Sequence, residues 1–301
     1  MKILVLSDNE GWHETLLGRA LAEAGADHRF GSVRDCHIGF QSPSGLVLPG
    51  FDNGLPDAVM VRAIPDGTFE EVTHRLDILH ALTESGVLVY NPVRSIEITI
   101  DKGMTSFLLA QAGIATPATW VSESAEEIRR ITETETAAGH KLVLKPLFGN
   151  CGRGLQLIEK PSQLPAAENL DGIYYLQRFI KQKSAAGRDW RVFVIGGRAV
   201  AAMERLSDHW ITNRARGGKC LPAVLTEPLR HIAERAAAVT RTAYAGVDVI
   251  MDENGNYLVL EVNSVPAWRG LQSVYQENIA RLLVEDLLGR LQQGGPRTQA
   301  L

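Results

Sequence analysis

An antiparallel hairpin is predicted by one stretch of the chain, Gly246-Val-Asp-Val-Ile-Met-Asp-Glu-Asn-Gly-Asn-Tyr-Leu-Val-Leu-Glu-Val-Asn263. Two runs rich in β-branched residues flank Asn254-Gly255, which is the strongest short-range signal for a two-residue turn. In a hairpin centred on that turn, Asp248 and Glu261 face each other, and Asn263 lies two residues further along the same face. We therefore expect three oxygen-bearing side chains to converge on one face of a sheet.

This convergence of acidic groups needs a physical reason, because like charges that face each other in a sheet are destabilising. A cation between Asp248 and Glu261 would supply one, since Mg²⁺ and Mn²⁺ prefer hard oxygen ligands. The sequence thus predicts a metal site made of Asp248, Glu261 and Asn263. The alternative is a solvent-facing polar row that happens to be acidic, although such a row would more naturally alternate lysine with glutamate.

Length and composition are typical of a cytoplasmic protein with more than one domain. The chain has 301 residues, of which 45% are hydrophobic and 22% charged, as is ordinary for globular proteins. Cys36, Cys151 and Cys220 form no metal-spaced or redox pair, which favours a reducing compartment. The N-terminal apolar run is too short for a signal peptide and no run approaches membrane-spanning length, so we expect no membrane partner.

Charge is distributed unevenly along the chain. The formal net charge of −4 argues against a dedicated nucleic-acid-binding protein. Between Arg178 and Lys219, however, ten Lys/Arg residues stand against three Asp/Glu residues. Such a basic segment in an acidic chain indicates a small anionic ligand, with a solvated basic face as the alternative.

The order of predicted elements indicates an α/β fold. The first part alternates strands and helices, as in a small parallel sheet with crossover helices: strands at 2–7, 58–62 and 87–90, helices at 14–24 and 69–85. After a boundary near 95–101, Asp101 is expected to cap a helix, and Pro117 marks the next strand. Later strands are predicted at 141–145, 155–159, 188–195 and 199–205, and later helices at 228–244 and 274–291. Residues 292–301 are expected to be disordered.

A glycine-rich motif reads Leu144-Lys145-Pro-Leu-Phe-Gly-Asn-Cys-Gly-Arg-Gly-Leu155. Gly149, Gly152 and Gly154 would let backbone N–H groups approach an anion closely, and Lys145 supplies a positive charge at the strand end. The motif is neither a Walker loop, which needs Gly-Lys-Ser/Thr, nor a dinucleotide fingerprint, which needs a following helix. We interpret it as a flap over phosphates; a plain hairpin turn is the alternative.

Three further cations fit such a flap. Lys102 follows a helix-capping residue, where a lysine opposes the helix dipole; the alternative is a solvated surface lysine. Arg191 and Arg205 lie on the two strands of a second predicted hairpin, and Asp189 shares a strand face with Arg191. We expect Asp189 to orient Arg191 or to contact a ribose, and the arginines to neutralise a transferring phosphoryl group. A solvent-facing arginine pair is the alternative.

Eight motifs, taken in this order, resemble the ATP-grasp ligases and, within them, the RimK-like glutamate ligases. They are Asp101-Lys102, Lys145-Pro-x-x-Gly149, Gln177-Arg-Phe-Ile180, Arg188-Asp-Trp-Arg191, Ala201-Ala-Met-Glu-Arg205, Asn213 with Gly217-Gly218, Gly246-Val-Asp248 and Glu261-Val-Asn-Ser-Val-Pro266. The resemblance implies an N-terminal Rossmann-like α/β domain (1–97), a central lid (98–177) and a C-terminal catalytic domain with an antiparallel sheet (178–291).

The resemblance also implies a binding site for ATP and a metal between the last two domains. Lys102 and Lys145 would contact the ATP phosphates. The hinge, which comprises Gln177, Arg178, Phe179 and Ile180, would hold adenine, largely by main-chain groups. The implied catalytic residues are Arg191, Arg205 and Asn213, and the implied ligands of Mg²⁺ (or Mn²⁺) are Asp248, Glu261 and Asn263.

The reaction implied by the resemblance is ligation, in which ATP converts a carboxylate into an acyl phosphate and an amine then forms an amide. The favoured small-molecule substrates are L-glutamate and a carboxylate acceptor. The segment Val265-Pro-x-Trp-Arg-Gly-Leu271 resembles the subgroup that adds glutamate to tetrahydromethanopterin. A peptide or protein C-terminus as acceptor, and a non-catalytic ATP-binding module, are the alternatives. Family relatives are often oligomers, so we expect a homo-oligomer.

Four positions depart from the family pattern or extend it towards the substrate. Arg178 stands where relatives commonly have glutamate, which leaves the base selectivity open. Ala267 replaces a glycine, so the local turn geometry is expected to differ. We expect Trp268 to stack on a flat substrate ring and Arg269 to bind a carboxylate; a packing role is the alternative for Trp268.

Overall fold

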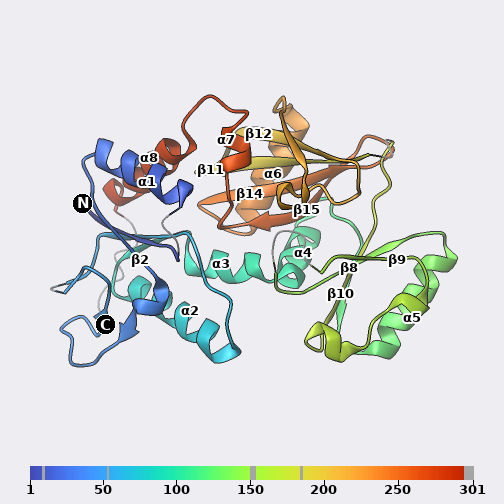
Figure 1. Cartoon of the computed structure of the whole chain (residues 1–301), viewed down its shortest axis with the longest axis horizontal. Helices are drawn as coiled ribbons and strands as arrows, with labels where there is room; N and C mark the ends of the chain where they lie inside the picture. Colours follow the sequence, from blue (N-terminus) through green and yellow to red (C-terminus); the bar gives the residue numbers. More distant parts are fainter. Residues whose placement is uncertain (9–10, 53, 150–153, 184–185, 295–301) are drawn as a thin grey trace.

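The computed structural model describes residues 1–8, 11–52, 54–149, 154–183 and 186–294. Its first unit is a parallel sheet in the order β2-β1-β5-β6, which confirms the predicted α/β alternation (Figure 1). The strands are β1 (Lys2–Leu6), β2 (Asp27–Gly31), β5 (Ala58–Val61) and β6 (Leu88–Tyr90), the helices are α1 (Trp12–Glu23) and α2 (Phe69–Glu84), and an excursion holds η1 (Val33–Asp35), β3 (His37–Ile38) and β4 (Leu46–Val47).

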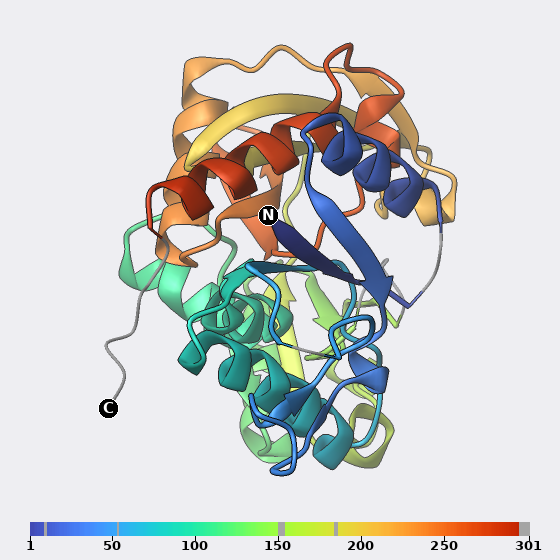
Figure 2. The same cartoon turned by 90° about the vertical axis from the view of Figure 1, so that its left-hand side faces the viewer.

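Both faces of this sheet are buried, because successive side chains of a strand point to opposite sides. Ile3 and Val5 pack with α1 and with the last helix of the chain, α8 (Ile279–Gln292). Leu4 and Leu6 pack with α2 on the other face. Helices α1 and α8 lie side by side (Figure 2), so the C-terminal end of the chain helps to cover the N-terminal sheet.

The second unit is an antiparallel sheet in the order β7-β10-β8-β9, covered by α5. Its elements are β7 (Thr119–Ser122), α5 (Ala125–Ala137), β8 (Leu142–Lys145), β9 (Gln156–Ile158), η2 (Pro161–Gln163), η3 (Ala167–Leu170) and β10 (Tyr174–Arg178). Ile128 of α5 packs against Leu142 and Leu144 of β8. Lys145 faces Tyr175 across the strands, so Lys145 and Gln177 are diagonal neighbours on one face.

The third unit is an antiparallel sheet in the order β13-β12-β11-β14-β15. Its elements are β11 (Gly187–Ile195), β12 (Arg198–Ser207), η4 (Arg214–Arg216), β13 (Lys219–Pro222), α6 (Glu227–Val239), β14 (Tyr244–Met251) and β15 (Tyr257–Asn263). Leu229 and Ala233 of α6 pack on one face, whereas Phe193 on the other face belongs to the cluster that includes α8. The connecting helices are α3 (Val93–Ile100), α4 (Lys102–Gln111) and α7 (Arg269–Gln272).

The hairpin of β14 and β15 differs from the prediction at its tip. The Asp252 N–H donates to the Asn256 carbonyl at 3.0 Å, and Gly255 has φ 92°, so three residues form the loop. The predicted two-residue turn is therefore wrong, and Val249 faces Val259. A bulge at Leu260 then shifts the register by one residue, so that Asp248 faces Glu261 as predicted.

Two helices are shorter than predicted. Helix α6 ends at Val239, and Tyr244 already belongs to β14, because the chain reverses through Arg241 at φ 57°. Helix α8 begins at Ile279, where Asn278 Oδ1 accepts the Arg281 N–H at 3.3 Å as an N-cap. Strands β2, β3, β4, β10 and β13 and helices α3, α5 and α7 have no counterpart among the predicted elements, and α3 occupies the predicted boundary.

The predicted domain limits, after residues 97 and 177, remain a prediction. The packing differs from them at the start of the predicted lid. Leu109 and Ile114, which fall within the predicted lid, belong to the core of the third sheet. Helix α8 extends to Gln292, one residue into the tail that we expected to be disordered, and residues 295–301 lie outside the described part. Within the described residues, no helix is long and apolar enough to cross a membrane.

Candidate active site

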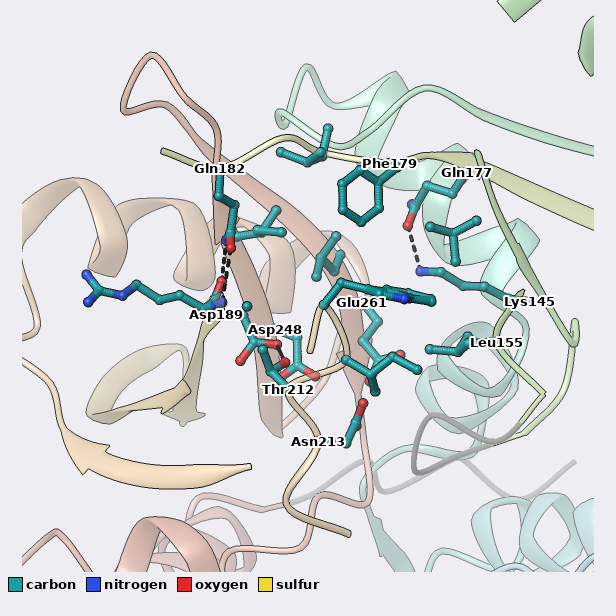
Figure 3. Close-up of a pocket in the computed structure, with 18 of the residues that line it drawn as sticks. Lys145, Leu155, Gln177, Phe179, Gln182, Asp189, Thr212, Asn213, Asp248 and Glu261 are labelled. Carbon is teal, nitrogen blue, oxygen red and sulfur yellow. Dashed lines mark hydrogen bonds between the residues drawn. The ribbon is translucent and has the colours of Figure 1, made fainter. Parts of the chain in front are cut away.

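A cavity of about 390 Å³ lies between the second and third sheets. Lys145 and Gln177 approach it from one side, and Asp248 and Glu261 from the other (Figure 3). The predicted site residues that line it are Lys102, Lys145, Gly149, Gln177, Arg178, Phe179, Ile180, Asp189, Arg205, Asn213, Asp248 and Glu261. One cavity therefore brings together most of the residues that the sequence singled out.

Two lysines with lowered pKa values stand at one end of the cavity. Lys145 Nζ donates to Gln177 Oε1 at 2.6 Å, and Lys102 Nζ donates to the carbonyls of Leu147 (3.1 Å) and Gly149 (2.8 Å). Burial lowers the pKa of Lys145 to about 8, against the attraction of Glu261. Burial likewise lowers the pKa of Lys102. The half-buried side chain and its two bonds to carbonyls disfavour the alternative of a freely solvated surface lysine. Neither ammonium forms an ion pair with any described residue, which suits a site for a polyanion.

The glycine flap is described only in part. Gly149 has φ 137° and Gly154 φ 69°, which are conformations that favour glycine. A Cβ atom at Gly154 would lie 2.7 Å from Pro146 Cγ. Gly154 does not line the cavity, and Gly152 lies outside the described residues. The phosphate-covering role of this segment therefore stays a prediction.

The segment after β10 presents main-chain groups to the cavity. The guanidinium of Arg178 turns to α5, where it forms a bidentate pair with Glu135 at 2.8 and 2.9 Å. The Phe179 ring meets the Trp210 ring edge-on, with the centroids 6.0 Å apart. The Ile180 N–H has no hydrogen-bond partner within the described part of the chain. These features suit a flat ligand ring that is held by the backbone.

Asp189 orients Arg205 and not Arg191. Arg205 Nε and Nη2 donate to the two carboxylate oxygens of Asp189, each at 2.7 Å, because the residues face each other across β11 and β12. Arg191 instead forms a bidentate pair with Asp248, which faces it on β14. The expected Asp189–Arg191 pair is wrong because residues two apart on a strand lie side by side, whereas facing residues meet at shorter range.

Asp248 has two cationic partners, since Arg205 Nη2 also lies 2.9 Å from its Oδ2. Burial alone would raise the pKa of Asp248, but Arg191 and Arg205 hold it well below its usual range. Burial and the neighbouring Asp248 raise the pKa of Glu261. The facing carboxylates therefore differ in pKa, and Arg191 and Arg205 offset their mutual repulsion.

The donor set fits a divalent ion in part. Asp248 is 3% exposed, so the solvent-facing polar row is excluded. Glu261 has no ion pair with any described residue, and a bound cation would lower its raised pKa. Asn263 does not line the cavity, and its Oδ1 accepts the Val265 N–H at 3.0 Å. Among the described residues, no three His, Cys, Asp or Glu side chains form a metal-binding group. Asp248 and Glu261 thus fit the metal better than Asn263 does.

Trp268 does not meet the expectation that it stacks on a substrate ring. Its side chain is 0% exposed and packs between the His13 ring, with centroids 4.5 Å apart, and the Arg62 guanidinium, 4.5 Å from the indole centroid. The packing alternative is therefore the correct one. Arg269 is exposed, lies outside the cavity, and places Cζ 5.9 Å from the Trp12 ring centroid.

The segment after β12 contributes a wall of the cavity that the sequence did not predict. Thr212 Oγ1 donates to Asp189 Oδ2 at 2.5 Å, and Trp210 lines the cavity beside Phe179. This segment is irregular, so no periodicity marked it. The only available signal was its position between the Arg205 and Asn213 motifs.

Comparison with solved structures identifies an ATP-grasp fold. The ATP-grasp ligase PsnB, complexed with a minimal precursor, matches with a TM-score of 0.73 and 22% identity, covering 96% of this chain and 99% of that one. A RimK domain ATP-grasp protein from Sphaerobacter thermophilus matches with a TM-score of 0.70 and 21% identity, covering 96% and 100%. At these identities the likeness establishes the fold alone.

Sequence comparison narrows the class to a family. A RimK-like ATP-grasp domain matches residues 99–287. The tetrahydromethanopterin:alpha-L-glutamate ligase of Methanococcus maripaludis is 36% identical over 236 residues, covering 76% of this chain and 77% of its own length. The enzyme of the same name from Methanosarcina acetivorans is 30% identical over 323 residues, covering 94% and 97%. The chain belongs to the RimK-like ATP-grasp family, and it is an ATP-grasp ligase.

Proposed function

We propose that this ligase uses ATP and Mg²⁺ to join the amine of L-glutamate to a carboxylate of an acceptor. The observation that carries the proposal is that one cavity is lined by Lys102 and Lys145 together with Asp248 and Glu261, with Lys145 on the side opposite the two carboxylates (Figure 3). A triphosphate between them would meet ammonium groups at one end and metal-binding carboxylates at the other. The names of the relatives support glutamate as the amine.

The nucleotide base would lie against the hinge, Gln177 to Ile180. The free Ile180 N–H and the Phe179 ring support main-chain recognition of adenine. The Arg178 side chain is held by Glu135, so it would take no part in reading the base. Asp189 lines the cavity and would reach the ribose with the oxygens that Arg205 and Thr212 already contact.

Asp248 and Glu261 would hold the metal, and Asn263 could add a third oxygen. When bound, Mg²⁺ would neutralise charge on the phosphate oxygens; Mn²⁺ suits the same ligands. Arg205 keeps Asp189 as a second partner, so it remains a fixed cation whether or not Asp248 binds a metal. The two arginines would then differ, because Arg191 has Asp248 as its only ion-pair partner among the described residues.

The reaction would take two steps. An oxygen of the acceptor carboxylate attacks the γ-phosphorus of ATP, which gives an acyl phosphate and ADP. The uncharged amine of L-glutamate then attacks the acyl carbon, the C–O bond to phosphate breaks, and the amine loses a proton. Arg205, which lines the cavity, and Arg191, which does not line it but pairs with Asp248, would stabilise the charge on the acyl phosphate and the tetrahedral intermediate. Asn213 also lines the cavity. Enclosure between the sheets would limit hydrolysis of the acyl phosphate.

The acceptor we favour is the carboxyl end of a tetrahydromethanopterin-type cofactor, because two relatives carry that substrate in their names. A peptide or protein C-terminus is the second candidate, supported by PsnB, which is described in complex with a precursor peptide. A non-catalytic module is disfavoured, since the lysines, arginines and carboxylates of the cavity are all present. We also propose that the protein self-associates, as its family commonly does.

Mass spectrometry tests the proposal directly. The full chain is incubated with ATP, Mg²⁺, isotopically labelled L-glutamate and either tetrahydromethanopterin or a peptide that ends in glutamate. We expect ADP release only when glutamate and an acceptor are both present, and a product heavier by the labelled glutamate residue. Labelling of the peptide alone would select the second candidate. ATP binding without acceptor-dependent turnover would select the non-catalytic module.

A further inference from the structure

Arg62 is a buried cation without an anionic partner among the described residues. It follows β5 directly, at the carboxyl edge of the parallel sheet, and is 8% exposed. Its Nη1 donates to Tyr244 Oη at 3.2 Å and its Nη2 to the Pro266 carbonyl at 3.1 Å, while Nε has no partner. A guanidinium held only by neutral oxygens keeps most of the desolvation penalty of its charge. Such a group is suited to an anion that binds later.

Two more guanidinium groups surround the same place, which lies where the segment before α7 meets the N-terminal unit. Arg269 lies over the Trp12 ring, and Arg214 Cδ lies 3.3 Å from the position that a Cβ atom would take at Gly270. Both side chains are exposed, and neither forms an ion pair with a described residue. All three guanidinium groups thus lie around His13 and Trp268, and the Arg62 guanidinium stacks on the indole ring.

His13 completes this group as a neutral hydrogen-bond donor. Its Nε2 accepts the Trp268 main-chain N–H at 3.2 Å, so the proton of the neutral ring lies on Nδ1. Burial, followed by Arg62, lowers the pKa of His13 to about 4; Arg269 and Arg214 act in the same direction and Glu14 against it. Glu14 is the next residue of α1, and its carboxylate accepts hydrogen bonds from Ser7 Oγ and the Gly11 N–H.

The cluster adjoins the reaction centre. Pro266, whose carbonyl holds Arg62, packs against Gly246 of β14. A Cβ atom at Gly246 would lie 2.8 Å from Pro266 Cβ and 2.9 Å from Arg191 Cδ. Pro266 and Arg191 therefore both border the space that a side chain at Gly246 would fill, and they are close neighbours. A substrate that reaches Arg191 could extend towards the second group of arginines.

We propose that Arg62, Arg214, Arg269 and His13 form a second anion site, which binds a substrate carboxylate other than the one that is activated. The inference rests on the proposed function for the identity of the substrate, but the site itself is defined by its uncompensated charge. Arginine suits this role because its planar guanidinium binds carboxylates through two parallel hydrogen bonds. The carboxylate could belong to L-glutamate or to the acceptor.

The test is calorimetric titration of the full chain, loaded with Mg²⁺ and a non-hydrolysable ATP analogue. The probes are L-glutamate for the amine substrate and L-glutamyl-L-glutamate for the carboxyl end of an acceptor. Arg214→Gln and Arg269→Gln change exposed residues, so the fold should persist, and Arg198→Gln at the exposed start of β12 is the matched control. We expect at least a fivefold higher Kd for one probe in both site variants, and no change in the control.

The probe that weakens identifies the source of the carboxylate. An unchanged Kd for both probes in both variants, or no binding of either probe to the wild type, would overturn the second anion site. ADP release, measured in parallel, reports on the proposed function separately. Turnover with unchanged Kd values removes the site and keeps the function, whereas arginine-dependent binding without turnover keeps the site and removes the function.

Discussion

Replacing Glu261 by glutamine separates the charge of this half-buried side chain from its shape. Glu261→Gln preserves the volume of the residue and its place opposite Asp248. Burial and Asp248 raise the pKa of Glu261 in the folded protein. The nucleotide-free protein therefore loses stability as the pH rises above the pKa that Glu261 has in the unfolded chain, because the ionised form is disfavoured in the fold. We expect the variant to be more stable than the wild type by about 0.2–1 kcal/mol, the range for a facing pair in a sheet. Its melting temperature should rise by up to about 3 °C.

The same variant should lose activity, because an amide oxygen contributes no negative charge to a bound metal. We expect kcat/KM to fall at least tenfold, which corresponds to about 1.4 kcal/mol of transition-state stabilisation. ADP release at varied Mg²⁺ and thermal unfolding without nucleotide are the two assays. Glu285→Gln on the exposed face of α8 is the matched control. Wild-type turnover would remove Glu261 from the metal site, and a joint loss of stability and turnover would show that its charge is structural.

Three further substitutions test other parts of the proposed nucleotide site. Lys145→Met should raise the Kd for ATP at least tenfold in calorimetric titration. In the wild type, the pKa of Lys145 is near 8, so between about pH 8 and 10.5 the unfolded chain binds more protons than the folded one. The stability of the nucleotide-free protein should therefore rise over this pH range, and the affinity for ATP should fall. Flat pH profiles would contradict both expectations. Arg178→Ala removes the ion pair with Glu135 of α5 and should lower the free energy of unfolding by about 0.5–1 kcal/mol. The preference for ATP over GTP should stay the same. A changed preference would mean that the Arg178 side chain contacts the base. Gly154→Ala, which places Cβ 2.7 Å from Pro146 Cγ, should raise the KM for ATP severalfold, whereas Gly289→Ala in open space should not; equal KM values would exclude a role for the flap geometry.

Features with a local signal could be predicted from the sequence. Asp101 was expected to cap a helix, and its carboxylate accepts the Met104 N–H at 3.0 Å at the start of α4. The alternation of apolar strands and amphipathic helices predicted the parallel sheet, because the spacing of apolar residues marks both kinds of element. The motifs that approach the cavity from separate sheets could be grouped only through the family resemblance, since no local pattern relates Lys145 to Glu261.

Features that depend on tertiary neighbours could not be predicted. Arg62 bonds to Tyr244 and Pro266, which are 182 and 204 residues away, and a single arginine after a strand has no motif. The pairing of Asp189 with Arg205 could not be predicted, because it depends on the register between two neighbouring strands. The burial of Trp268 could not be predicted, because it depends on His13 and Arg62, which belong to the N-terminal unit and are distant from Trp268 in the sequence.

The bulge at Leu260 lies between the loop of the β14–β15 hairpin and the carboxylates of Asp248 and Glu261 near its other end. The tip, Asp252–Asn256, closes through its own hydrogen bonds, and its last four residues are exposed to solvent. The unpaired residue absorbs the phase difference before Glu261, so the tip can be exchanged or labelled without rotating the carboxylate out of the cavity. A fluorophore attached at Asn254 would therefore travel with β14 and β15 as a passive reporter of how the two antiparallel sheets approach each other when nucleotide binds.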